Sequence, residues 1–410
     1  MRGPLLAVLG AGLLLAGGAW LAGRHCSARH ARELARQQEA WAAEKAGLEA
    51  AIEQARAEAA RVDMRAAAAT APPVSARRLS PAEIIERLRS LGASGAVSAA
   101  RLREAVYWLE DLARIGPAAL PAVREFLARN EEIEFDTSWF QGRAGRDWKW
   151  PAEQVAPVSL RLGLFDVVRR IGGEGAEALL VETLGVTGRG LEVAWLTRAL
   201  HEMATNKYRE AALTSARALL ASGAPQNSAS PLDRYHREYL FGVLAFYGDS
   251  GYAAEAQAQL VRADSQIDRG ALKYLQQTLG PQAVPIVAQA YQNPALGTNS
   301  SAKEPLARLA LNYVGADGTA DEFWRRAIND PVLTQDQRRN LIEDLNQDGF
   351  ADTRNLTAND LSLIQARMAL IEELAPNAMD KVNAAAFAEA YKDLVNMRAK
   401  IAGQAPTARP

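Results

Sequence analysis

Cysteine is almost absent from this chain of 410 residues, since Cys26 is the only one. A single cysteine excludes a disulfide within the chain and a cysteine-based zinc cage, so we expect packing alone to hold the fold together. A net charge of either sign is also missing, because 47 Lys and Arg side chains balance 48 Asp and Glu side chains. Without an overall positive field, the chain is not expected to bind nucleic acid.

Motifs for catalysis are equally scarce. Histidine occurs four times, and the "HEMAT" stretch that begins at His201 has Thr205 where a zinc-protease helix needs its second histidine. The sequence contains no glycine-rich phosphate loop and no serine nucleophile motif. His236 follows a helix start capped by Ser230, and we expect its charged helix face to be exposed to solvent. The sequence therefore predicts a protein that is not an enzyme and has no catalytic cofactor.

The N-terminus carries a long uncharged segment, "GPLLAVLGAGLLLAGGAWLAG", at residues 3 to 23. About 20 apolar residues suffice to cross a bilayer core of roughly 30 Å, so residues 1 to 27 are predicted to form a single-pass transmembrane anchor with a basic flank. A cleaved signal peptide is the alternative, although the stretch is longer than usual and lacks a clear cleavage motif. The arginines that follow the apolar segment favour a cytoplasmic location for the C-terminal body. An apolar N-terminal start followed by a long soluble domain is, however, also typical of a bacterial exported protein, so the side of the membrane stays open.

The next segment, residues 28 to 66, contains no proline and is rich in Ala, Glu, Arg and Gln. Apolar side chains recur in it at every seventh position: Leu34, Trp41, Leu48, Ala55 and Val62. This spacing predicts a helical stalk that forms a homodimeric coiled coil, with one long solvated helix as the alternative. Prolines make residues 67 to 79 a linker, and "LSPAE" starts the folded domain with Ser80 as N-cap. A helical repeat domain is predicted over residues 80 to 402, before a disordered tail at 403 to 410.

Three segments share one pattern, an apolar helix ending in Ile-Gly or Leu-Gly, a short turn and a second apolar helix: residues 107 to 127, 164 to 184 and 272 to 291. Two looser copies cover 244 to 260 and 309 to 328, and a degenerate copy lies near "MATNKYREAALTSARALL". The junction glycines can adopt the left-handed conformation that caps a helix: Gly116, Gly172, Gly248, Gly280 and Gly315. We find no sustained alternation typical of strands.

The turns "IGPAALPAVREFL" and "LGPQAVPIVAQAY" resemble those of HEAT or armadillo repeats, and the resemblance covers about residues 100 to 330. It implies an all-α fold, an α-solenoid of HEAT-like helix pairs. It brings no catalytic residues with it. Two further helices, at 358 to 374 and 382 to 401, are expected to close the array.

One segment interrupts the repeats, "FDTSWFQGRAGRDWKW" at residues 135 to 150. Its aromatic and basic side chains form the candidate partner-binding set: Trp139, Phe140, Arg143, Arg146, Trp148 and Trp150. Aromatics interleaved with arginine are typical of surfaces that bind a peptide or a sugar ring. The alternative is a loop that folds back and buries its tryptophans against the helices.

The segment "DLNQDGFADTRN", residues 344 to 355, resembles an EF-hand or dockerin calcium loop over its first nine positions. The resemblance implies a glycine turn at Gly349 and five oxygen ligands: Asp344, Asn346, Asp348, the carbonyl of Phe350, and Asp352. Asn355 stands where the bidentate acid belongs, so calcium binding is expected to be weak, about 0.1 to 1 mM. The alternative is a polar turn whose side chains cap their own backbone, followed by a helix that starts late, at Thr357.

Together these features predict a membrane-anchored, non-enzymatic scaffold that binds a protein partner through its solenoid surface. The alternative from another class is a cell-envelope enzyme or a glycan-binding protein that uses residues 135 to 150. The third interpretation is a purely structural spacer with no binding role. Weakly bound Ca²⁺ is the only inorganic ligand that the sequence suggests.

Overall fold

The computed structural model describes residues 79 to 93, 98 to 135, 157 to 222 and 230 to 404. Residues from Leu79 onward form one compact unit, distinct from residues 1 to 78. The predicted anchor, the stalk and nearly all of the linker and tail lie outside the described residues. Within the described part of the chain, no helix combines the length and the apolar character needed to cross a membrane.

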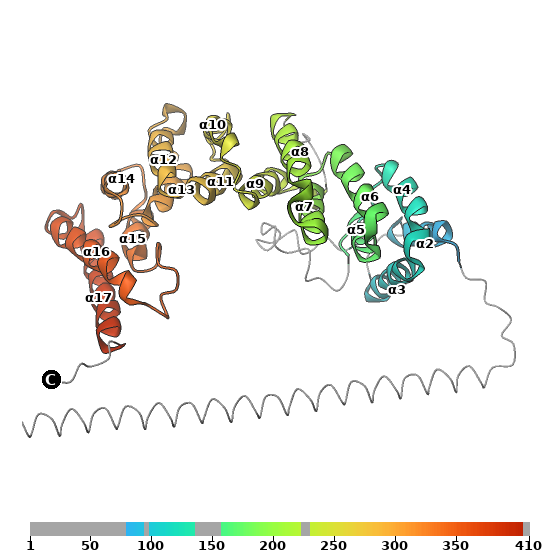
Figure 1. Cartoon of the computed structure of the whole chain (residues 1–410). Coiled ribbons are helices and arrows are strands. Elements are labelled where there is room, and N and C mark those ends of the chain that lie inside the picture. The colour runs from blue at the N-terminus through green and yellow to red at the C-terminus, as the bar shows by residue number, and fades with distance from the viewer. Residues whose placement is uncertain (1–78, 94–97, 136–156, 223–229, 405–410) are drawn as a thin grey trace, which may run out of the picture. The chain divides into compact units, whose positions relative to one another are not determined.

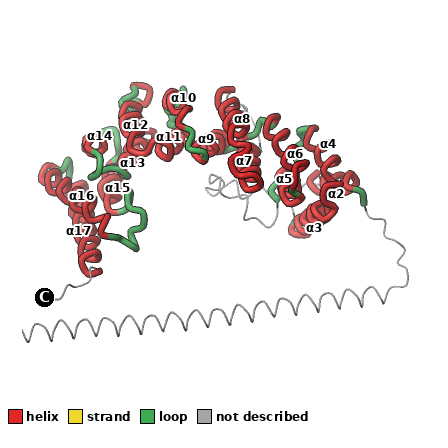
Figure 2. Tube along the Cα trace, in the orientation of Figure 1, coloured by secondary structure: helices red, strands yellow, loops and turns green. Residues whose placement is uncertain are grey.

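The described residues are all-α, which confirms the predicted class (Figure 2). Their only β pairing is a pair of isolated bridges, Glu134 with Ser159 and Val261 with Ile267. The first half of the unit contains α2 (Pro81–Ala93), α3 (Ala99–Ile115), α4 (Leu120–Ala128), α5 (Leu160–Ile171), α6 (Gly173–Val186), α7 (Gly190–Ala204) and α8 (Arg209–Ser222). The second half contains α9 (His236–Phe246), α10 (Ala253–Ala258), α11 (Arg269–Leu279), α12 (Ala283–Tyr291), α13 (Ser300–Leu311), α14 (Gly318–Ile328), α15 (Gln335–Glu343), α16 (Leu361–Leu374) and α17 (Lys381–Gln404).

The predicted helix pairs are present, from α3 with α4 to α13 with α14. The degenerate copy near residue 210 is also a full pair, α7 with α8. All five junction glycines have positive φ, between 57° and 86°. This conformation is costly for a side chain with a Cβ atom, which favours glycine at these five junctions. In α3, α5 and α11 the glycine directly follows the last helical residue.

Successive pairs pack side by side in two layers. The first helices contact one another in the order α3, α5, α7, α9 and α11, and the second helices do so in the order α4, α6 and α8 (Figure 1). The apolar faces meet in one continuous core, whose largest fully buried apolar side chains include Tyr239, Tyr274 and Trp324. Each such burial stabilises the fold by about 1.5 to 3 kcal/mol, so neighbouring pairs support one another. This stacking agrees with the predicted helix-pair arrangement, while membership of a HEAT-like class stays a prediction.

The two ends of the unit follow the sequence closely. At the start, the Ser80 backbone N–H donates to the Glu83 carboxylate at 2.8 Å, and the Glu83 N–H donates to the Ser80 hydroxyl. This is the predicted capping box of α2. At the other end, α17 packs on α15 and α16 through a stripe of buried side chains: Ala386, Ala390, Leu394, Met397 and Ile401. The predicted closing helices are therefore confirmed.

Candidate functional site

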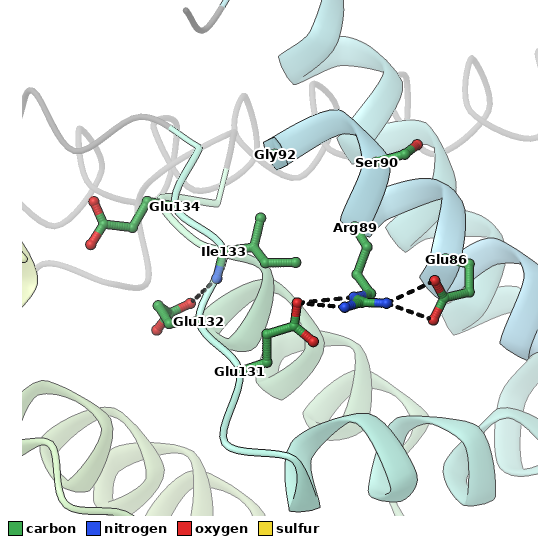
Figure 3. Close-up of a pocket in the computed structure, with 8 residues that line it drawn as sticks. All are labelled: Glu86, Arg89, Ser90, Gly92, Glu131, Glu132, Ile133 and Glu134. Carbon is green, nitrogen blue, oxygen red and sulfur yellow. Dashed lines mark hydrogen bonds and ion pairs between the residues drawn. The ribbon is translucent and has the colours of Figure 1, made fainter. Parts of the chain in front are cut away.

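A pocket of about 600 Å³ lies between α2 and the extended residues that follow α4. Its lining carries four glutamates but one arginine: Glu86, Arg89, Ser90, Gly92, Glu131, Glu132, Ile133 and Glu134. Figure 3 shows Arg89 between Glu86 and Glu131, with hydrogen bonds to both. The lining residues themselves carry more carboxylates than guanidiniums, and Arg189 and Arg129 approach two of these carboxylates, Glu132 and Glu86, from outside the lining.

The pocket wall depends on a close approach of the chain to α2. A Cβ atom on Gly92 would lie 1.9 Å from the Ile133 side chain, so only glycine lets Ile133 pack against the helix at this point. Arg89 then joins the two sides, because its guanidinium donates to Glu131 at 2.7 Å and to Glu86 at 3.0 Å. These two bonds raise the pKa of Arg89, which keeps it charged.

The described residues on the two sides of the predicted insertion lie beside each other. The Phe135 N–H donates to the Val158 carbonyl at 2.8 Å, and the Leu160 N–H donates to the Ile133 carbonyl at 2.8 Å. These bonds form a short antiparallel bridge that holds residues 133 to 135 beside 158 to 160. Phe135 is 6% exposed and belongs to the core. The six candidate partner-binding residues, from Trp139 to Trp150, lie outside the described residues.

A buried charge cluster lies directly behind the bridge. The Arg161 guanidinium donates to both oxygens of Glu192, at 2.7 and 2.9 Å, and both side chains are at most 3% exposed. In the next layer, Arg189 donates to both oxygens of Asp233 at 2.9 Å. The remaining donor of Arg189 bonds to Glu132. The cluster therefore links the extended segment after α4 to the starts of α5, α7 and α9.

Burial changes the titration of this cluster. It raises the pKa of Glu132 to about 7, only in part offset by the positive charge of Arg189. The nearby charge of Glu192 raises that pKa further. For Arg189, burial opposes ionisation, but its bond with Asp233 and the surrounding carboxylates together raise the pKa. For Glu132, a hydrogen bond from the Ser159 hydroxyl and the charge of Arg161 lower the pKa, and the side chain, 17% exposed, is a partly buried acid whose pKa stays raised.

His236 corrects one prediction from the sequence. It was expected on a solvent-exposed helix face, but it is 3% exposed. The start of α7 packs against the start of α9, where the Gly190 N–H donates to the His236 Nδ1 at 3.0 Å. Burial lowers the pKa of His236, and the charges of Arg237 and Arg189 lower it further, against the opposing effect of Asp233. The imidazole is therefore neutral at neutral pH.

The candidate calcium loop lies between α15 and α16, and its acidic side chains already bind protein groups. Asp344 accepts a hydrogen bond from Arg308 at 2.6 Å, and Asp348 lies 3.7 Å from the same guanidinium nitrogen. Asp352 accepts from its own backbone two residues on, at Arg354. Asn346 donates to Asp393 of α17 at 2.6 Å. Among the described residues, no group of three or more His, Cys, Asp or Glu side chains is placed to hold a metal ion.

The loop is built around an internal cation instead. The guanidinium of Arg367, on α16, is fully buried and donates to four backbone carbonyls: Leu311, Val314, Leu345 and Asp348. It also lies 5.0 Å from the centroid of the Phe350 ring. Burial lowers the pKa of Arg367 to about 10, so it stays charged at neutral pH. These contacts are typical of a polar turn, which was the alternative interpretation of this segment. Calcium binding stays a prediction.

Sequence reasoning missed the acidic pocket and the charge cluster. The only local signal was the run "EEIE" at residues 131 to 134, directly before the tryptophan-rich insertion. The partners of these glutamates come from α2 and from the residues that precede α7 and α9, so no spacing rule along the chain joins them. The chain matches no protein-family model, and neither the curated proteins nor the solved structures include a significant match.

Proposed function

We propose that this chain is a non-enzymatic scaffold that binds a protein partner through its helix pairs and is held at a membrane by residues 1 to 27. The HEAT-like pattern of the sequence supports the scaffold, because stacked helix pairs offer extended surfaces for other proteins. The uncharged run at residues 3 to 23 supports the anchor.

The observation that carries the binding role is the acidic pocket. Its volume of about 600 Å³ accommodates a long side chain, and its lining holds four glutamates against one arginine. We therefore propose that the partner inserts a lysine or arginine side chain between α2 and residues 131 to 134. Charge-assisted hydrogen bonds to the carboxylates would fix that side chain.

The experiment places a photo-reactive amino acid at Ser90, on the pocket wall, in the full-length chain within the cells that make it. The expected result is one recurrent adduct with a defined protein. Glu131→Lys should abolish this adduct, because it reverses the charge beside Arg89. Glu210→Lys is the matched control, since its side chain on α8 is 74% exposed and its hydrogen bond is to the adjacent Arg209.

Two outcomes would contradict the proposal. Equal adducts from a probe at Ser90 and a probe at position 210 would indicate random encounters, as expected of a structural spacer. Retention of the full chain on cell-wall material, without a protein adduct, would favour the glycan-binding alternative.

A further inference from the structure

The outer face of α12 carries no charged side chain. Residues 274 to 302 contain no Asp, Glu, Lys, Arg or His, although charged residues make up 23% of the chain. This run extends from Lys273 to Lys303 and lies wholly within the described residues. A solvent-facing surface normally mixes charges of both signs, whereas charged residues are depleted at the centre of protein–protein interfaces.

The exposed residues of α12 and its two caps form a single stripe, which we call the outer stripe. The opposite side of the helix packs into the core through Val284, Val287 and Tyr291. Two partly buried apolar side chains, Ile286 and Ala290, border the stripe. The stripe itself consists of exposed residues at helical spacing, namely Gln282, Pro285, Gln289 and Gln292.

Charged side chains flank the outer stripe on the neighbouring helices. α12 lies between α10, where the Gln257 amide donates to the Gln289 side-chain oxygen at 3.1 Å, and α14, which packs against it (Figure 1). The exposed charged residues of these neighbours are Glu255 on α10 and Glu322 and Arg326 on α14. A neutral centre with a charged border is the arrangement typical of a protein–protein interface.

The chemistry of the stripe favours a second copy of this chain as its partner. In a two-fold symmetric contact both subunits use the same patch, so a side chain near the axis meets its own copy. A Lys or Glu at that place would face a like charge, whereas a glutamine amide both donates and accepts, so it can pair with its own copy. A charged partner, by contrast, finds no opposite charge on the stripe.

The heptad pattern at residues 28 to 66 is an independent argument for a second copy, because it predicts a homodimeric stalk. Two chains joined in this way present their helical units to each other at an effective concentration on the order of millimolar. At that concentration a small neutral face is sufficient for self-association.

We propose that the outer stripe of α12 is a self-contact between two copies of this chain, with Gln289 near the two-fold axis. The contact buries Ile286 and Ala290, the apolar residues that border the stripe. It is separate from the acidic pocket beside α2, so it goes beyond the proposed binding role and does not rest on it.

Chemical cross-linking of the full-length chain in membranes tests the proposal. Cys26→Ser removes the only cysteine, and Gln292→Cys then places a single thiol on the outer stripe. A short bismaleimide is expected to convert this variant into a covalent dimer. Arg354→Cys is the control, because that side chain is 90% exposed but lies on the loop between α15 and α16, and it should give about tenfold less dimer.

A charge placed on the stripe tests whether Gln289 meets its own copy. Gln289→Lys, added to the Gln292→Cys chain, should lower the dimer yield about tenfold, because two like charges then face each other. Gln277→Lys is the matched control: it makes the same change at an exposed glutamine of the same uncharged run, but on α11, and should leave the yield unchanged. Since the predicted stalk is identical in all variants, a selective loss reports on the stripe.

Co-expression of Gln289→Lys and Gln289→Glu chains should restore the cross-link between the two variants, because opposite charges then meet. This rescue also shows that both variants are folded. Equal dimer yields from thiols at positions 292 and 354 would indicate random collisions of tethered chains and would overturn the proposal. So would a full yield in Gln289→Lys, or a loss that the mixed chains do not restore.

Discussion

Arg367 offers the sharpest test of how the loop at residues 344 to 352 is held. Replacement by methionine keeps the aliphatic stem but removes every donor of the guanidinium. The four carbonyls that it binds belong to the end of α13 and to the loop itself, and the contact is fully buried. Among the described residues, no other side chain donates to these four carbonyls, so the replacement removes the hydrogen bonds that Arg367 supplies to them.

The expected cost follows from those acceptors. A buried polar group left without its partner costs about 1 to 3 kcal/mol, and the low end applies because each carbonyl is a neutral acceptor with two lone pairs. Four acceptors at about 1 kcal/mol each give a loss of about 4 kcal/mol. The Phe350 ring loses its cation contact as well, which adds about 1 kcal/mol.

Hydrogen exchange across residues 311 to 317 and 345 to 350 is the suitable assay, because long repeat arrays need not unfold in one step. A loss of about 4 kcal/mol corresponds to roughly a thousandfold fall in protection. Arg354→Met is the control, since that side chain is 90% exposed and should change protection by less than about twofold. A fall below about tenfold in Arg367→Met would refute the reasoning.

Three other predictions follow from the same geometry. Gly116→Ala should destabilise by about 1 to 3 kcal/mol through its backbone conformation, φ 73° and ψ −144°, because nothing lies near the added Cβ. Gly185→Ala inside α6 should instead stabilise by about 0.5 to 1 kcal/mol, and urea unfolding compares the two. The pKa of Glu132 is higher in the folded protein, about 7, than the usual 4.5, so its contribution to stability is full below pH 4.5 and is lost as pH rises through 7. Between pH 6 and pH 8 this loss is about 1.4 kcal/mol, and denaturant titrations at constant ionic strength that show no loss would count against it. For the loop, calcium at about 1 to 5 mM should leave the melting temperature unchanged; a rise that Asp348→Ala removes would instead establish the calcium site.

Local signals proved reliable where one short segment contains both partners of an interaction. The capping box at Ser80 and the late helix start at Thr357, whose N–H donates to Asp360 at 2.7 Å, both depend on residues three positions apart. The junction glycines depend on a single φ angle. In these cases one short segment specifies both the backbone geometry and the side chain, so the sequence is sufficient to predict the feature.

Long-range contacts account for what the sequence did not reveal. His236 looked like a surface residue because its neighbours are charged, but Gly190, distant along the chain, packs over it. The spacing of Asp344 and Asp348 predicts metal ligands, and only the tertiary structure shows that Arg308 from α13 lies beside both. The spacing of acidic residues shows which carboxylates a loop offers, but it leaves open whether a metal ion or an arginine binds them.

The sequence by itself determined the all-α class, the helix pairs, their glycine junctions and the closing helices, because each follows from apolar periodicity and local capping. Only the tertiary structure decided that four glutamates share a pocket beside α2, that Glu132 meets Arg189 from the start of α7, and that Arg367 occupies the centre of the loop at residues 344 to 352. The physical reason is that burial and charge balance are properties of groups brought together from separate helices. A buried charge gains or loses its proton according to all its neighbours, and those neighbours are set by packing.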